Sequence, residues 1–165
     1  ERTSQLEKLA QMDSLTNIYN QRSMYDFLKR ELALAKRHDS KLSIIYFDVD
    51  NFKAINDEHG HIKGDEVLKT IGLILLKNTR DTDIPCRHGG DEFCLILPDC
   101  DIDSAKLICE KIIKDFKSRY KSFSLSFGVA QSGPDNYDIE GQDLIREADR
   151  HMYKAKSING NAINS

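Results

Sequence analysis

Residues 84–97 read IPCRHGGDEFCLIL, two strand-like runs separated by a pair of glycines. The runs are rich in the apolar and β-branched residues that are typical of strands. Glycine adopts the positive backbone φ angles that tight hairpin turns require, so Gly89 and Gly90 are predicted to form the turn. The sequence therefore predicts an antiparallel hairpin here, with Asp91 and Glu92 directly after the turn.

Helical and strand-like patterns alternate on both sides of this hairpin. The other predicted strands cover residues 42–47 and 123–129, and the predicted helices cover 20–37, a short segment from 51, 63–78, 105–116 and 144–155. Residues 42–47 form a nearly continuous apolar run and should be buried on both faces. Residues 123–129 alternate with small polar residues and should have one buried face. From 157 onward the tail should form an irregular end or a short edge strand.

The order of these elements from residue 42 to 129 is β-α-α-β-β-α-β. This is the split βαβ or ferredoxin-like pattern, so an α/β (α+β) fold is predicted. The chain has 165 residues, which favours one domain. We expect residues 13–165 to form it and residues 1–12 to be the end of a connecting helix from an upstream domain, with a frayed terminus as the alternative. The absence of an initial Met indicates a fragment.

Composition excludes several functional classes. Lys and Arg number 24 against 27 Asp and Glu, for a net charge of −3, which argues against a dedicated nucleic-acid binder. No apolar run is long enough to span a membrane, and the N-terminus lacks a signal peptide. Four cysteines without a CxxC pair favour reduced thiols over a disulfide or metal set. A cytoplasmic domain is expected, although the full-length protein could be membrane-anchored.

Two acidic clusters lie where strands begin or end. Asp48 and Asp50 close the first predicted strand, and Asp91 and Glu92 follow the glycines. If the two strands are neighbours, Asp48 and Asp91 converge at one end of the sheet. Paired carboxylates suit Mg²⁺, which prefers hard oxygen ligands and shares them with substrate phosphates. The alternative is a set of solvated acids at strand ends.

Several motifs at matching separations resemble the GGDEF family, the catalytic domain of diguanylate cyclases. The resemblance rests on 47–65, FDVDNFKAINDEHGHIKGD, and on 87–93, RHGGDEF. Residues 13–22, DSLTNIYNQR, are similar to the family's DxLTGLxNRR opening, with Asn17 in place of its Gly. Residues 126–130 and 148–156 are similar to its closing motifs. The resemblance implies a palm-type, nucleotidyl cyclase-like fold with a central mixed sheet flanked by helices.

The resemblance also implies the roles of the site residues. Asp48, the Val49 carbonyl and Asp91 would hold Mg²⁺, with Mn²⁺ as an alternative cation. The implied catalytic residues are Asp48, Lys53, Asp91 and Glu92. Gly89 and Gly90 would let the backbone approach the phosphates closely, and Lys53 and Lys156 would contact the triphosphate.

The guanine base would be read by Asn56 and Asp65. An Asp accepts from the N1–H and N2–H₂ donors of guanine, which adenine lacks, so GTP is the expected substrate. Phe52 is expected to pack beside the nucleotide. Asp65 could instead cap the following helix, and His61 could pack in the core or turn rather than contact the ligand.

Arg80 and Asp83 resemble the RxxD inhibitory site of the family, where they would bind the cyclic di-GMP product. The alternative is a local hydrogen bond between a helix-end Arg and a strand-start Asp. Arg87 is expected to have a structural or dimer-contact role. One departure concerns the family's Lys-x-x-Gly-Arg-Asn ending, which here reads KSINGN over 156–161, so its triphosphate-clamping Arg is missing.

The implied function is condensation of two GTP into cyclic di-GMP with release of pyrophosphate. It requires an antiparallel homodimer, which an upstream sensory domain would control, and the product would inhibit it. The alternative is a weak or inactive domain that serves as a receptor for cyclic di-GMP or GTP. An adenylate-type cyclase of related fold is disfavoured by Asn56 and Asp65.

Overall fold

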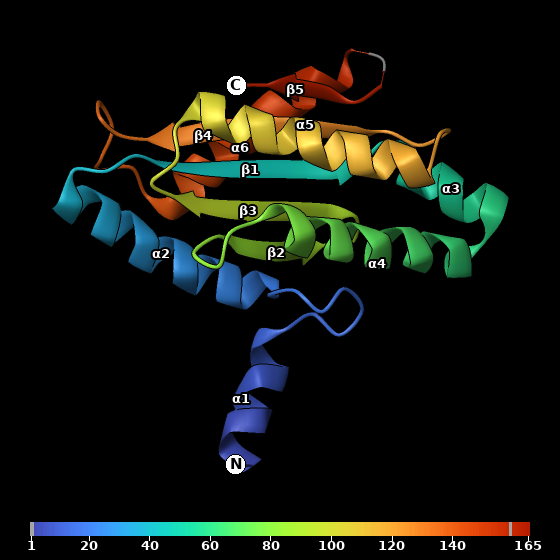
Figure 1. Cartoon of the computed structure of the whole chain (residues 1–165), viewed down its shortest axis with the longest axis horizontal. Coiled ribbons are helices and arrows are strands. Elements are labelled where there is room, and N and C mark those ends of the chain that lie inside the picture. Colours follow the sequence, from blue (N-terminus) through green and yellow to red (C-terminus); the bar gives the residue numbers. More distant parts are fainter. Residues whose placement is uncertain (1, 159) are drawn as a thin grey trace.

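In the computed structural model, a five-stranded sheet with the strand order β2-β3-β1-β4-β5 forms the centre of the chain (Figure 1). The structure describes residues 2–158 and 160–165, without the side chains of residues 2–4, 8 and 9. The strands are β1 (Leu42–Val49), β2 (Ile84–Gly89), β3 (Glu92–Pro98), β4 (Leu125–Ser132) and β5 (Ala162–Asn164). Strands β1 to β4 pair with one another in antiparallel orientation. Strand β5 runs parallel to β4, which makes the sheet mixed.

Helices cover both faces of this sheet (Figure 1). They are α1 (Arg2–Gln11), α2 (Gln21–His38), α3 (Phe52–His59), α4 (His61–Asn78), α5 (Ile102–Arg119) and α6 (Gly141–Lys156). The predicted ferredoxin-like, palm-type arrangement is thus confirmed. The Asn20 side chain caps α2, where it accepts from the Ser23 backbone N–H. Within 2–158 and 160–165, no helix is both long and apolar enough to cross a membrane.

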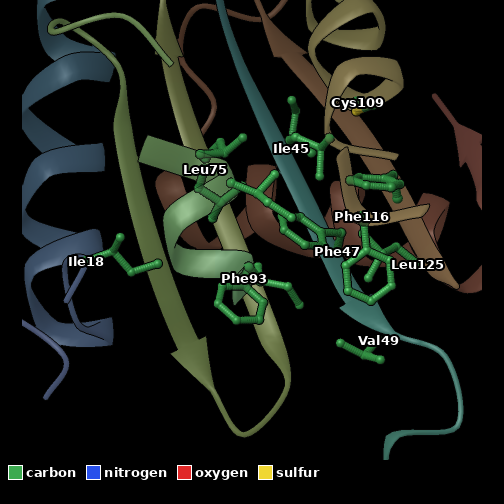
Figure 2. Packing of buried hydrophobic residues seen from close by; sticks show 14 of the residues in the cluster. Ile18, Ile45, Phe47, Val49, Leu75, Phe93, Cys109, Phe116 and Leu125 are labelled. Atoms are coloured by element: carbon green, nitrogen blue, oxygen red, sulfur yellow. The ribbon is translucent and has the colours of Figure 1, made fainter. Parts of the chain in front are cut away.

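The core consists of two apolar layers separated by the sheet. Alternate residues of β1 point to opposite faces, as the period of two in a strand requires. Ile45 and Phe47 pack with α4 and α5, where Leu75 and Phe116 are fully buried (Figure 2). Ile44 and Tyr46 pack on the other face with α2 and α6. The prediction that the first strand is buried on both faces is therefore confirmed.

Strand β4 is also buried on both faces, so the prediction of one buried face is wrong. The small residues that suggested an exposed face lie under α6 instead. A Cβ at Gly128 would overlap the Ala148 carbonyl oxygen and the Met152 amide nitrogen. Gly128 therefore lets the helix backbone pack directly on the strand, and Ser126 is 1% exposed. The tail forms the edge strand β5, one of its two predicted outcomes.

The hairpin of β2 and β3 is confirmed, but its turn lies one residue later than predicted. Gly89 pairs with Glu92, which leaves Gly90 and Asp91 as the turn residues. The register shifts between Arg87 and Gly89, so a β-bulge falls at His88. Gly90 has a φ of +49°, a left-handed conformation that favours glycine. Asp91 thus sits in the turn itself.

All four cysteines are buried and free, in agreement with the predicted reduced thiols. Burial raises the pKa of the Cys94 thiol to about 12 and that of Cys100 to about 11. Since the thiolate is the reactive form, these shifts lower the reactivity of both thiols in the folded chain.

Candidate functional site

The acidic residues of β1 and of the hairpin meet at one end of the sheet. Asp48 pairs with Glu92 in the register of β1 and β3. Below them the rings of Phe47 and Phe93 stack with centroids 5.3 Å apart. The expectation that these two strands are neighbours is thus confirmed, and Asp91 lies close enough to raise the pKa of Asp48.

Asp48 is the most buried acid of this group, with 6% of its surface exposed. Its Oδ2 accepts from Lys156 Nζ at 2.5 Å. Its buried Oδ1 has no hydrogen-bond partner among the described residues. Burial raises the Asp48 pKa to about 6 even though Lys156 opposes the shift. A buried carboxylate oxygen without a partner is costly, and a cation is the ligand that would satisfy it.

Asp91 is half-buried in the hairpin turn beside the end of β1. Burial raises the pKa of its carboxyl group, and the nearby backbone N–H groups of Asp91 itself and of Val49 oppose this shift. Asp48 and Asp91 therefore lie near each other, with the Val49 backbone beside Asp91. Carboxylate oxygens are the kind of ligand that a hard divalent cation prefers. Among the residues that the structure describes, no three His, Cys, Asp or Glu side chains form a metal cluster. A cation here would also need backbone, water or ligand oxygens.

Glu92 lies in a polar network with two residues that the sequence analysis did not single out for a role. Its Oε2 accepts from the Tyr46 hydroxyl at 2.7 Å and lies 3.3 Å from His88 Nδ1. His88 Nε2 in turn lies 3.3 Å from the Tyr25 hydroxyl. Burial and the bond to Glu92 raise the Tyr46 pKa far above its ordinary value. The tyrosine on the otherwise apolar strand was the only sequence signal for this contact.

Asp50 is fully engaged in structural hydrogen bonds. It accepts from the Ser124 and Ser126 hydroxyls at 2.5 and 2.6 Å. Asp50 thereby ties the end of β1 to β4, although the sequence grouped it with Asp48. On the same side, the Asn161 side chain accepts from the Leu125 backbone N–H at 2.9 Å, which anchors the chain just before β5.

The candidate guanine-binding residues lie around the junction of α3 and α4. Asn56 and Phe52 lie next to Gly64, where a Cβ would overlap Asn56 Oδ1. That oxygen is buried and has no partner among the described residues. Asp65 follows Gly64 in the sequence and is exposed on α4, whereas Asn56 is partly buried. The role of Gly64 was missed, because a single glycine inside a helical pattern carries little signal.

Two alternative roles for residues of α4 are wrong: Asp65 as the cap of this helix, and His61 as a residue packed in the core or the turn. This helix begins at His61 with Gly60 as its cap, so Asp65 lies inside the helix and does not cap it. His61 is exposed in the first turn of the helix, so it packs in neither the core nor the turn.

The two candidate phosphate-binding lysines lie on different elements. Lys53 is exposed near the start of α3, and Lys156 ends α6 beside Asp48. Gly89 and Gly90 are exposed, and a Cβ at either would meet no described atom within 4 Å, so the space over the turn is open to a ligand. Residue 159, in the altered closing motif, lies outside the described residues.

Arg87 holds the hairpin turn through contacts with the turn backbone and with the loop before α2. Its guanidinium donates to the Gly90 carbonyl at 2.7 Å and pairs with Asp13 at 3.2 Å. Asp13 also accepts from the Thr16 backbone and hydroxyl. Arg87 thus has the structural role expected of it, and it links the loop before α2 to the turn that carries Asp91.

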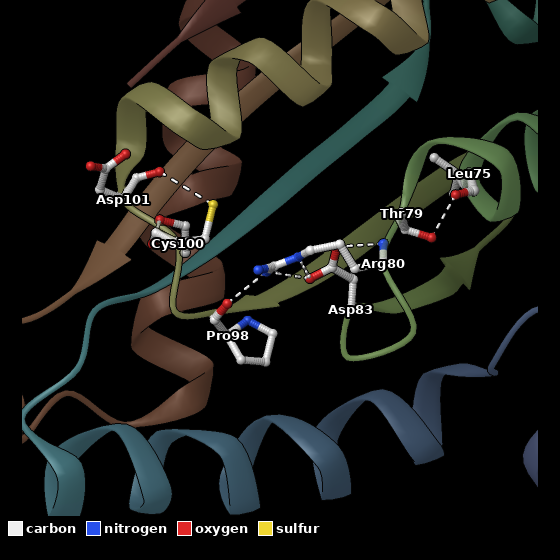
Figure 3. Close-up of polar contacts among 8 residues, drawn as sticks. Leu75, Thr79, Arg80, Asp83, Pro98, Cys100 and Asp101 are labelled. Atoms are coloured by element: carbon white, nitrogen blue, oxygen red, sulfur yellow. Dashed lines mark hydrogen bonds and ion pairs between the residues drawn. The ribbon is translucent and has the colours of Figure 1, made fainter.

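Arg80 and Asp83 bond to each other, as the local alternative for this pair predicted (Figure 3). Arg80 Nη2 donates to Asp83 Oδ1 at 2.7 Å and to the Pro98 carbonyl at 2.7 Å. The Asp83 side chain is fully buried, while that of Arg80 is 53% exposed. A surface pocket of about 380 Å³ adjoins the pair and is also lined by Arg30.

Comparison with known proteins gives the same family over nearly the whole chain. The family model described as "Diguanylate cyclase, GGDEF domain" matches residues 10–162. Diguanylate cyclase DgcS of Shewanella oneidensis is 36% identical over 92% of this chain and 51% of its own length. Response regulator PleD of Caulobacter vibrioides is 34% identical over 94% of this chain and 36% of its own. The chain thus spans about a third to a half of these relatives.

Solved structures agree with the sequence comparison. The coiled coil and GGDEF domain of DgcB from Caulobacter crescentus, in complex with c-di-GMP, superposes with a TM-score of 0.91 at 25% identity, over 99% of this chain and 89% of that one. Diguanylate cyclase SiaD from Pseudomonas aeruginosa, in complex with its activator SiaC, gives 0.88 at 27% identity, over 98% and 64%. On these grounds the chain belongs to the diguanylate cyclase GGDEF family.

Proposed function

We propose that this chain is a catalytic domain that condenses two GTP molecules into cyclic di-GMP and releases two pyrophosphates. The observation that carries the proposal is the buried Asp48, whose Oδ1 has no partner among the described residues, next to Asp91 in the glycine turn. Such a carboxylate pair at an open turn suits a metal-bound triphosphate. Membership of the family supports the same chemistry.

Asp48, the Val49 carbonyl and Asp91 would hold a divalent cation, Mg²⁺ or alternatively Mn²⁺. When bound, the cation neutralises charge on the phosphate oxygens. Glu92, fixed by the Tyr46 hydroxyl, completes the acidic end of the site. It is the residue that we expect to accept the proton of the attacking 3′-hydroxyl.

Recognition of the substrate would be divided between the α3–α4 junction and the turn. Asn56 and Asp65 would hydrogen-bond the guanine edge, and Phe52 would pack beside the base. His61, exposed at the start of α4, would contact the nucleotide from that side. The backbone at Gly89 and Gly90 would lie against the phosphates, and Lys53 and Lys156 would neutralise them.

The reaction needs two copies of the chain in antiparallel orientation. Each 3′-oxygen attacks the α-phosphorus of the other GTP, so two P–O bonds form, two break, and two pyrophosphates leave. Positioning and charge stabilisation account for most of the catalysis. Activity should therefore rise when the chain is fused to a dimeric helix at its N-terminus.

The test is incubation of the chain, alone and as a dimeric fusion, with GTP and Mg²⁺, followed by chromatography for cyclic di-GMP. We expect product from the fusion and none from its Asp91→Asn variant. Lys154→Gln, an exposed change on α6, is the matched control and should keep full activity. Absence of product from the folded, dimeric fusion would refute the enzyme and leave the receptor alternative.

That alternative has one supporting observation. Gly160 stands where the family has the Arg that clamps the triphosphate, so phosphate binding has one fewer cation. A receptor would bind cyclic di-GMP or GTP in calorimetry yet form no product in any dimeric fusion.

Product inhibition through Arg80 and Asp83 is also proposed. Because Arg80 is bonded to Asp83 and to the Pro98 carbonyl, cyclic di-GMP would have to draw the guanidinium out of this contact. Arg80→Ala should remove inhibition and leave initial turnover unchanged. Persistence of inhibition in this variant would place the inhibitory site elsewhere.

In the full-length protein we propose an upstream sensory domain joined through α1, and a cytoplasmic location. The relatives are two to three times as long as their matched segments, which leaves room for such a domain. Four free cysteines suit a reducing compartment. No role in nucleic-acid binding is proposed.

A further inference from the structure

Lys156 lies at the acidic site, where it forms an ion pair with Asp48. Its Nζ is 2.5 Å from Asp48 Oδ2. The bond to Asp48 raises the Lys156 pKa, and the charges of Asp50 and Asp91 act in the same direction. Lys156 is therefore the direct counter-ion of Asp48, and Asp50 and Asp91 add to the negative field around it.

The proposed function assigns Asp48 and Asp91 to a divalent cation as well. The ammonium and a divalent cation repel each other strongly at the few ångströms that separate groups sharing one carboxylate. The Asp48 side chain is 8% exposed, so solvent can screen this repulsion only weakly. With the ammonium on Oδ2 and the metal at the unpartnered Oδ1, the two cations would compete for the charge of one carboxylate.

We infer that Lys156 is an internal cation that a divalent metal must displace from Asp48, and that the triphosphate accepts the displaced ammonium. The inference rests on the proposed function and adds to it that metal and nucleotide bind cooperatively. Metal without nucleotide has to break an ion pair, whereas metal with a triphosphate moves Lys156 to new anionic oxygens. Metal and nucleotide therefore each increase the affinity for the other, as linkage requires.

The position of Lys156 suits this movement. It is the last residue of α6, and its side chain is 36% exposed, so its flexible four-carbon stem is free to turn outward. An ammonium is also a compact point charge, which can exchange one oxygen partner for another without the fixed geometry of a guanidinium. Lys154, two residues earlier, lies about 200° around the helix and is exposed, so it provides a control.

The first test measures Mn²⁺ binding by electron paramagnetic resonance at pH 8, without nucleotide. Lys156→Gln should bind Mn²⁺ about tenfold more tightly than the wild-type chain, because a bond to a charged group no longer has to be broken. Lys154→Gln should bind like the wild type. Equal or weaker Mn²⁺ binding by folded Lys156→Gln would overturn the inference.

The second test follows the Lys156 side chain in the wild-type chain, so it does not depend on the folding of a variant. Its Hε and Cε NMR signals should shift when Mg²⁺ is added, and shift further with Mg²⁺ and a non-hydrolysable GTP analogue. Unchanged signals at saturating Mg²⁺ would show that the lysine is not displaced. Neither test requires turnover, so failure of the cyclase assay and failure of this inference are separate results.

Discussion

Replacing Asp48 with asparagine should stabilise the metal-free chain at neutral pH and abolish its proposed activity. The pKa of Asp48, about 6, lies about 2 units above its ordinary value of 3.8 because of burial. One unit corresponds to about 1.4 kcal/mol, so the charged form costs the folded state about 3 kcal/mol at pH 8. Asparagine has nearly the same shape and no charge, and it removes this cost.

The assay is urea denaturation of both chains in EDTA between pH 4 and pH 8. Because the Asp48 pKa is raised in the folded state, wild-type stability is favoured below pH 4 and lost as the pH rises through 6. The variant lacks that loss, so the difference in unfolding free energy should grow from near zero at pH 4 to about 3 kcal/mol at pH 8.

The reasoning is refuted if Asp48→Asn is less stable than the wild type at pH 8, or if its gain does not depend on pH. Asp50→Ala provides the contrast. Asp50 accepts from Ser124 and Ser126, so its loss should reduce stability by about 1–3 kcal/mol. Mg²⁺ should raise the stability of the wild type more than that of Asp48→Asn.

Three further outcomes follow from packing. Gly128→Ala should cost about 3 kcal/mol in urea melts, because its Cβ would overlap backbone atoms of Ala148 and Met152; a change below 0.5 kcal/mol would contradict the close approach. Gly64→Ala meets the side chains of Asn56 and Phe52 and no backbone atom among the three nearest. It should cost about 1 kcal/mol yet lower calorimetric affinity for a GTP analogue about tenfold, and unchanged affinity would remove this residue from the nucleotide site. The four buried cysteines should react with a thiol reagent no faster than the chain unfolds, so rapid native labelling would be contrary to their burial.

The fold was largely predictable because its central strand is a nearly continuous apolar run and its hairpin carries two glycines. The burial of β4 was not, because small residues under a helix have the same alternating pattern as residues facing water. Only the approach of α6 to Gly128 distinguishes the two cases. The turn was misplaced by one residue because a bulge at His88 leaves no mark in composition.

The convergence of Asp48 and Asp91 was predictable from their positions at strand ends. The structural role of Asp50 was not predictable, since its serine partners lie more than 70 positions away in the sequence. The contacts of Tyr46 and His88 with Glu92 were missed for a similar reason. Such hydrogen bonds depend on sheet register, which a single sequence specifies only indirectly.

The sheet order has a consequence for synthesis on the ribosome. β1 emerges first among the strands, yet it occupies the middle of the sheet, and its partners end at Pro98 and Ser132. The backbone N–H and C=O groups along the edges of this apolar strand stay unpaired until much of the chain has been made. Nascent chains are therefore prone to aggregation. Truncation before Ser132 should leave β1 with an open edge, so the shortest chain that remains dispersed must extend through β4.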